Sequence, residues 1–242
     1  MTMNGNYDYT PLPPEPRRLA LPVSRPWATY VLIGLNAAAF IPTLLSSEVV
    51  YGYGALIPAA VSVDGQWWRL LTAAFLHGGV MHIVFNLYAL RGLGTLLEHF
   101  FDARRFLVVY FGALWTSSVL VTLFAAPDSK TVGASGAIMG VLGALVIFYW
   151  RYRTLLVGGQ HYLTEMLKMA AINVLIGLTP HISFWGHFGG LLGGLLLGWA
   201  LCPRYEYDGF SPALERLPVG PREWLGVLFT FGAGAALLVW GG

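Results

Sequence analysis

Long apolar segments alternate with short polar connections along this sequence. About 20 consecutive apolar residues allow a helix to cross the hydrocarbon core of a bilayer. The chain is 56% hydrophobic and only 11% charged, whereas a soluble domain carries about 25% charged residues. Seven segments meet or approach the spanning length, at about residues 27–46, 78–98, 105–125, 134–150, 163–180, 184–202 and 223–240. The pattern predicts an all-α, polytopic transmembrane helical bundle with seven spans.

These segments divide the chain into three parts. Residues 1–26 are rich in proline and not apolar, which is typical of a disordered tail and not of a cleavable signal peptide. We expect residues 27–203 to form one core of six helices, and residues 204–242 to add a cytosolic connection and a C-terminal transmembrane helix. The segment 163–180 is the weakest because it contains Lys168 and Asn173, and we expect a short or tilted helix there.

The distribution of lysine and arginine predicts the orientation. With the N-terminus in the cytosol, eleven of these residues lie on or near the cytosolic side, and only Arg69 and Lys130 face out. Arg91 lies within the second segment. Cytosolic loops of membrane proteins carry an excess of lysine and arginine. We therefore expect a multi-pass protein of the lipid bilayer, of bacterial plasma-membrane type, with its C-terminus outside.

Composition also argues against several functions. A net charge of +2 without a basic stripe does not favour nucleic-acid binding. The single cysteine, Cys202, cannot form an intrachain disulfide, and no cysteine and histidine cluster indicates a metal site. We therefore expect no metal and no cofactor. No internal repeat supports a transporter built from inverted repeats.

Polar side chains interrupt three of the apolar segments at a similar depth. His82 and Asn86 are four residues apart in the second segment, so they share one helix face. Ser135 opens the fourth segment within a Gly-Ala-Ser-Gly sequence, and His187 lies near the outer end of the sixth. Polar and ionisable groups inside membrane helices are costly and usually functional. This coincidence of depth predicts a site below the outer surface.

These residue types suit acyl transfer. A serine hydroxyl is a weak nucleophile, and the imidazole of His187 could take its proton and return it to a leaving amine. The Ser135 amide at a helix N-terminus, with side-chain donors from His82 and Asn86, could stabilise an oxyanion. No aspartate lies at this depth to orient His187, so the sequence predicts a dyad. Taken singly, each residue also has a structural explanation, such as packing or an interhelical hydrogen bond.

The motifs together resemble those of the rhomboid intramembrane proteases. They occur in that family's order and lie within about residues 27–203. The resemblance rests on Trp68-Arg69, His77-x4-His82-x3-Asn86, Gly94-x3-Glu98, Gly133-Ala134-Ser135-Gly136, and His187 with Gly190 and Gly194.

The resemblance implies a six-helix core that cleaves single-pass membrane proteins in or near their transmembrane segment. Ser135 would be the nucleophile, His187 the general base, and the Ser135 amide with His82 and Asn86 the oxyanion hole. The fifth helix and the loop at 179–183 would form a substrate gate. Structural support would come from Trp68, Arg69, His77, Glu98, Gly133, Met139, Gly190 and Gly194.

The sequence departs from the family's pattern at two positions. Met139 stands where many members have an aromatic residue, and Gly186 stands where many have alanine. A thioether still contacts an imidazole edge favourably, so we expect weaker positioning of His187 and not loss of activity.

Two other functions fit part of the pattern. The first is a rhomboid-like protein without catalysis that binds membrane clients, but such relatives lose the serine, the histidine or the motif glycines, and all are present here. The second is a channel or transporter whose histidines relay protons. Proton relays usually use carboxylates, and no acidic residue shares the histidine depth. The sequence specifies neither the substrate nor the oligomeric state.

Overall fold

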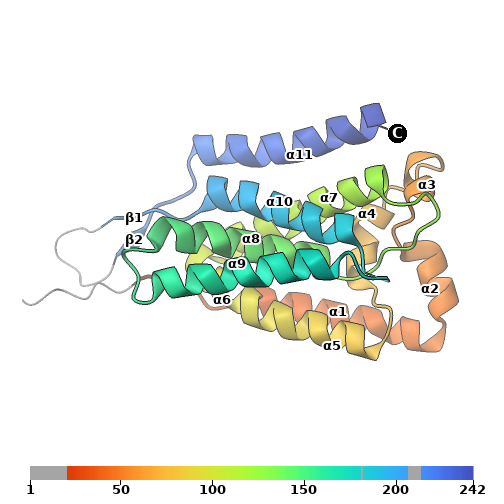
Figure 1. The fold of residues 1–242 in the computed structure, drawn as a ribbon, viewed down its shortest axis with the longest axis horizontal. Coiled ribbons are helices and arrows are strands. Elements are labelled where there is room, and N and C mark those ends of the chain that lie inside the picture. Colours follow the sequence, from red (N-terminus) through yellow and green to blue (C-terminus); the bar gives the residue numbers. More distant parts are fainter. Residues whose placement is uncertain (1–20, 181, 207–213, 242) are drawn as a thin grey trace, which may run out of the picture.

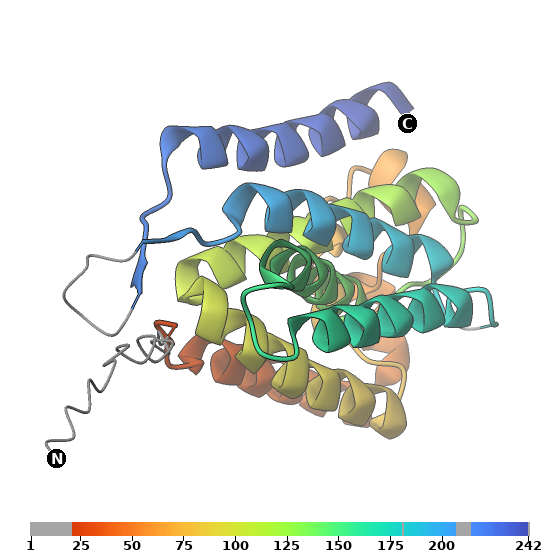
Figure 2. The ribbon, with the colours of Figure 1, turned by 60° about the vertical axis from the view of Figure 1, so that its left-hand side comes forward.

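The computed structural model describes residues 21–180, 182–206 and 214–241. These residues form a bundle of long helices, with α8 at its centre (Figures 1 and 2). The second long helix is continuous from α5 through the π-helix η2 into α6. The predicted all-α bundle is therefore confirmed. The long elements are α1 (Trp27–Leu45), α5 (Val80–Ala89), η2 (Leu90–Gly94), α6 (Thr95–Phe101), α7 (Ala103–Phe124), α8 (Ser135–Tyr152), α9 (Gly159–Ile176), α10 (Phe184–Leu201) and α11 (Pro221–Gly241).

Six helices of the described chain are long and apolar enough to cross a membrane. They correspond to six of the seven predicted segments, and α9 corresponds to the weakest one. Helix α9 has 18 residues, as α8 has, and packs on α8 and α10. It is less apolar because it contains Glu165 and Lys168. These two exposed residues form an ion pair, with Lys168 Nζ 2.9 Å from Glu165 Oε1. The multi-span bundle thus includes one helix whose sequence is atypical of a span.

The connection between α1 and α5 folds into short helices. The side chains of Arg69 and Trp68 join these helices by hydrogen bonds to the backbone. The Arg69 guanidinium donates to the carbonyls of Gly52 at 2.6 Å and Ala55 at 2.7 Å. Trp68 Nε1 donates to the carbonyl of Tyr53 at 3.0 Å. The pair therefore holds the loop backbone at the bundle end where α5 begins. These short elements are α2 (Ser47–Gly54), α3 (Pro58–Ser62), α4 (Arg69–Thr72) and η1 (Ala73–Phe75).

At the opposite end, the connection to α11 forms a small antiparallel sheet of β1 (Tyr205–Glu206) and β2 (Glu215–Arg216). The Arg216 guanidinium donates to the carbonyls of Pro22 at 2.8 Å and His99 at 3.0 Å. This connection is thereby tied to α6 and to the segment before α1. Helix α11 then packs on α7 and α10. Residues 1–20 of the predicted tail lie outside the described residues.

Glu98 of α6 is fully buried and joins the second long helix to the first turn of α1. Its carboxylate accepts the Ala28 N–H at 2.9 Å, and the Thr29 N–H and hydroxyl at 2.8 and 2.7 Å. The first amides of a helix lack intrahelical acceptors, and a negative charge there is favoured by the helix dipole. Gly94 lets α1 approach, because a Cβ there would lie 3.0 Å from Thr29 Cγ2. The Gly94-x3-Glu98 pair therefore holds α1 against the bundle.

Glycines bring the backbone of α10 directly against the backbone of α8. A Cβ at Gly190 would lie 2.7 Å from the carbonyl carbon of Gly136, and one at Gly194 would overlap Gly140. Carbon atoms in good contact are about 3.5–4.0 Å apart, so neither position has room for a side chain. Small residues allow such close approach of membrane helices. We call this contact the α8–α10 seam.

We predict that Gly190→Ala destabilises the protein, because its methyl group must separate α10 from α8. Overpacking of this kind costs about 1–3 kcal/mol. Gly34→Ala in α1 is the matched control, because no atom lies within 4 Å of its Cβ position. Thermal unfolding in detergent should show a lower midpoint for Gly190→Ala alone. Equal midpoints for the two variants would contradict the close packing of the seam.

Candidate active site

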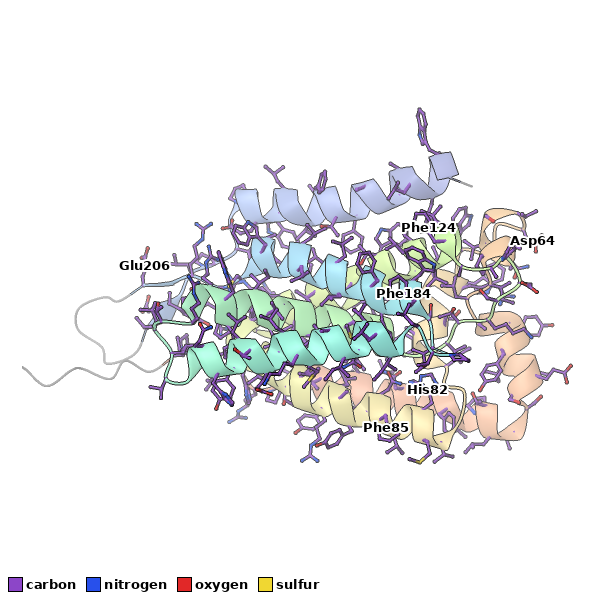
Figure 3. All side chains as sticks on the ribbon, in the orientation of Figure 1. Asp64, His82, Phe85, Phe124, Phe184 and Glu206 are labelled. Carbon is purple, nitrogen blue, oxygen red and sulfur yellow. The ribbon has the colours of Figure 1, made fainter. Side chains whose placement is uncertain are left out.

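The polar residues of three long helices meet at one end of the bundle. Ser135 is the first residue of α8, His82 lies in the first turn of α5, and His187 lies in the first turn of α10. Figure 3 shows His82 and Phe184 toward this end, and Glu206 at the other. The alternating directions of the helices therefore gather residues that are far apart in the sequence.

A turn at Gly133 presents Ser135. Gly133 has φ +122°, a conformation that strongly favours glycine. Its N–H donates to the carbonyl of Ala73 at 2.9 Å, which ties the turn to η1. A Cβ at Gly133 would lie 2.9 Å from His82 Nε2 and 3.9 Å from Ser135 Oγ. Both the backbone and the available space therefore require glycine, and the His82 ring lies beside the turn that carries Ser135.

The imidazole of His187 is buried, and its Nδ1 lies 2.8 Å from the carbonyl oxygen of Asn173 in α9. A carbonyl oxygen can only accept, so Nδ1 carries a proton, and in the neutral ring the lone pair is on Nε2. The α8–α10 seam also brings the neighbours of His187 and Ser135 together. The carbonyl oxygen of Gly186 lies 3.3 Å from the Cβ position of Gly136. The fold therefore orients this imidazole so that Nδ1 faces Asn173 and Nε2 is left available.

His82 has the opposite arrangement of its ring proton. The Gly78 N–H donates to His82 Nδ1 at 3.2 Å, so Nδ1 acts as the acceptor and Nε2 carries the proton. This N–H belongs to the nitrogen that lies next to the Gly133 position. One histidine of the site is therefore arranged to donate a hydrogen bond, and the other is arranged to accept a proton.

Asn86 and His77 support His82 from two sides. Asn86 Nδ2 donates to the carbonyl of His82 at 2.9 Å, which uses one of its two amide protons. The His77 ring is fully buried and meets the His82 ring edge-on, with centroids 5.2 Å apart. Burial lowers the pKa of His77 to about 4, so this imidazole is neutral at pH 7. Met139 is also buried, one turn along α8 from Ser135.

The structure adds a contact that the sequence did not reveal. The carbonyl of Asn173 holds His187, whereas the Asn173 side chain donates within α9 to the carbonyl of Met169 at 2.8 Å.

Among the described residues, no hydrogen bond joins Ser135 to His187. Catalytic hydrogen bonds are often long without substrate and shorten when it binds. Within the same residues, no group of three metal-binding side chains occurs.

Comparisons with known proteins agree on one family. A family model described as the Rhomboid domain matches residues 64–204, which include α4 to α10. Rhomboid protease GluP of Bacillus subtilis (strain 168) is 34% identical over 183 residues, which are 73% of this chain and 35% of GluP. RHOMBOID-like protein 6, mitochondrial, of Arabidopsis thaliana is 36% identical over 167 residues, 68% of this chain and 54% of that protein.

A shorter relative is matched over most of its length. YdcA of Bacillus subtilis (strain 168), provisionally named a rhomboid protease, is 33% identical over 143 residues, 59% of this chain and 71% of YdcA. The chain belongs to the rhomboid family. It spans about a third of GluP and about half of the Arabidopsis protein.

Proposed function

We propose that this protein is an intramembrane serine endopeptidase in which Ser135 is the nucleophile and His187 the general base. One observation carries this proposal: the hydrogen bond between His187 Nδ1 and the Asn173 carbonyl leaves Nε2 free to accept a proton. The substrates would be single-pass membrane proteins, cleaved in or near their transmembrane segment. Membership of the rhomboid family supports the reaction class, since GluP is named a protease.

In the proposed reaction, His187 Nε2 takes the proton of Ser135 as Oγ attacks a substrate carbonyl carbon. The resulting imidazolium is stabilised by the Asn173 carbonyl at Nδ1, which takes the orienting place that an aspartate has in a triad. His187 then gives the proton to the departing amine, and an acyl-enzyme forms at Ser135. Water attacks that ester with the same imidazole as base, and this step restores the serine.

The oxyanion would receive hydrogen bonds from the start of α8 and from His82. The amide of Ser135 lies in the first turn, where helix N–H groups lack intrahelical acceptors and the helix dipole favours negative charge. His82 Nε2–H lies beside the same turn and adds a side-chain donor. Asn86 holds the backbone of His82, so in this scheme its main contribution is to position that donor.

We expect Ser135→Ala and His187→Ala each to abolish cleavage of a single-pass substrate in proteoliposomes. The double variant should be no slower than either single variant, because residues that act as a unit are strongly non-additive. Ser117→Ala is the control, because Ser117 is a buried serine whose Oγ contacts the Gly136 position. Cleavage that persists in Ser135→Ala, or is lost in a folded Ser117→Ala variant, would contradict the assignment of the nucleophile.

We predict that His82→Ala reduces turnover more than Asn86→Ala does. Removing one oxyanion donor typically lowers turnover by about 10²–10³-fold, whereas Asn86 acts through His82. Met81→Ala changes an exposed side chain of the same helix and should leave turnover unchanged. Initial rates at saturating substrate distinguish the three variants. A wild-type rate in His82→Ala would exclude this histidine from the oxyanion hole.

We also propose that the bundle end with Ser135 faces outward across a bacterial plasma membrane. The opposite end carries arginines at the start of α7 and the end of α8, which suits the cytosolic side. Single cysteines in a Cys202→Ala background should show this with a membrane-impermeant maleimide. Ser129→Cys should react in intact cells, and Val157→Cys only after permeabilisation, since Ser129 is partly exposed and Val157 is exposed. The reverse result would contradict the proposed orientation.

A further inference from the structure

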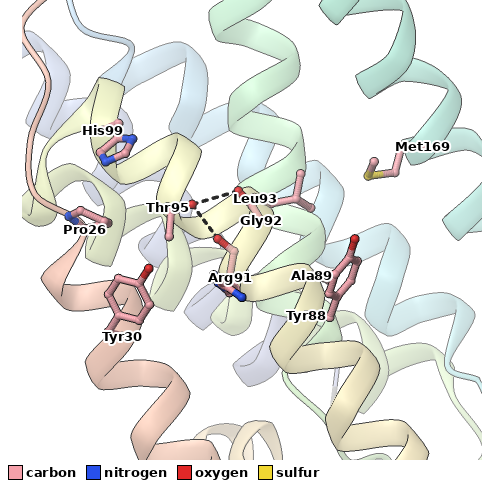
Figure 4. A pocket seen from close by; sticks show the side chains of 10 residues that line it. All are labelled: Pro26, Tyr30, Tyr88, Ala89, Arg91, Gly92, Leu93, Thr95, His99 and Met169. Atoms are coloured by element: carbon pink, nitrogen blue, oxygen red, sulfur yellow. Dashed lines mark hydrogen bonds between the residues drawn. The ribbon is translucent and has the colours of Figure 1, made fainter.

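A cavity of about 590 Å³ lies on the flank of the bundle, between α1 and the second long helix (Figure 4). Its lining runs from Pro26 and His99, near the end opposite Ser135, to Tyr88 and Arg91, nearer the middle. Met169 of α9 also contributes. Most of the lining is apolar, so the cavity is suited to hydrocarbon, but the charged side chain of Arg91 also lines it.

Arg91 lies at an unusual depth for a charged residue. The span runs from Val80 to Phe101, so Arg91 is about 15 Å from either end at the rise of an α-helix. Its side chain is exposed on the bundle surface. A charge at this depth is costly unless it is paired. Among the described residues, no carboxylate forms an ion pair with Arg91, and Glu98 on the same helix is occupied by the amides of α1.

Several polar side chains surround Arg91 along the cavity. Arg91, Thr95 and His99 recur every four residues, so they form a polar stripe from mid-membrane toward the surface. The Thr95 hydroxyl, at the start of α6, donates to the Arg91 carbonyl in η2 at 2.6 Å (Figure 4). Within the described part of the chain, the hydroxyls of Tyr30 and Tyr88 donate to no protein group.

The geometry points to a binding site for an anionic phospholipid of the leaflet opposite Ser135. Its phosphodiester would lie near His99, toward the membrane surface, and the Arg91 side chain would extend toward it from mid-membrane. One acyl chain would follow the apolar lining toward Met169. A phosphate offers only acceptors, and a guanidinium binds two of its oxygens at once. The volume falls in the range of ligand sites, about 300–1,000 Å³.

A lipid suits this cavity better than the helix of a protein partner. The backbone carbonyls of a membrane helix are already satisfied by its own amides, so they offer few acceptors at the depth of Arg91. The π-helix η2 occurs at the same place, and such widened turns are frequent at functional sites. This site is separate from Ser135, and its occupation does not depend on the proposed protease activity.

The test is lipid retention by the full chain. The protein would be purified from vesicles of equal parts phosphatidylglycerol and phosphatidylcholine, and the retained lipids counted by native mass spectrometry. Wild-type protein should be enriched in phosphatidylglycerol. Arg91→Gln should lower that enrichment roughly fivefold, the effect of one cationic contact with an anionic lipid. Arg91→Lys keeps the charge but loses the contact with two oxygens, so its enrichment should lie between those of wild type and Arg91→Gln.

Two further variants make the result decisive. Arg104→Gln removes an exposed arginine of α7 that does not line the cavity, and it should leave the enrichment unchanged. Met169→Trp keeps the charge but fills the apolar part, and it should reduce retention of both lipids. Equal enrichment in wild type and Arg91→Gln would overturn the site, as would an equal loss in Arg104→Gln. If Arg91→Gln fails to fold, unchanged retention in Met169→Trp overturns it instead.

Discussion

The rest of the candidate site depends on the α8–α10 seam. At Gly190 and Gly194 no side-chain atom separates the two helix backbones, so α10 contacts the first turns of α8 directly. Ser135 opens one helix and His187 lies in the first turn of the other, and their separation is therefore set by backbone contact and not by flexible side chains. A membrane offers little hydrophobic force between helices, so close packing has to supply this precision.

The proposed division of labour between the two histidines follows from their backbone partners. Each imidazole has one nitrogen bound to the main chain: Asn173 offers His187 an acceptor, and Gly78 offers His82 a donor. The two rings then present opposite chemistry on their remaining nitrogens, a lone pair from His187 and an N–H from His82. General-base catalysis and oxyanion stabilisation require this pair of properties. The proposed mechanism therefore needs no buried carboxylate at the depth of Ser135.

Much of the fold could be predicted from the sequence, because an apolar segment of spanning length has few alternatives to a membrane helix. The exception was α9, whose Glu165 and Lys168 weaken the signal that identifies a span. The residues gathered at the candidate site could also be proposed from their depth on separate helices. Their hydrogen-bond partners could not, because the carbonyl of Asn173 and the amide of Gly78 belong to the main chain, which every residue type shares. The contacts of Arg69 could not be predicted either, because they are also made with main-chain carbonyls.

Covalent labelling tests the central claim, that His187 activates Ser135, without requiring a known substrate. The purified protein would be treated with a fluorophosphonate, and the modified residue identified by mass spectrometry of its peptides. The account predicts one adduct, on Ser135, in the wild type, and none in His187→Ala, where the hydroxyl is intact but the base is gone. Labelling of Ser135 at the wild-type rate in His187→Ala, or an adduct on Ser117 or Ser183 instead, would contradict it.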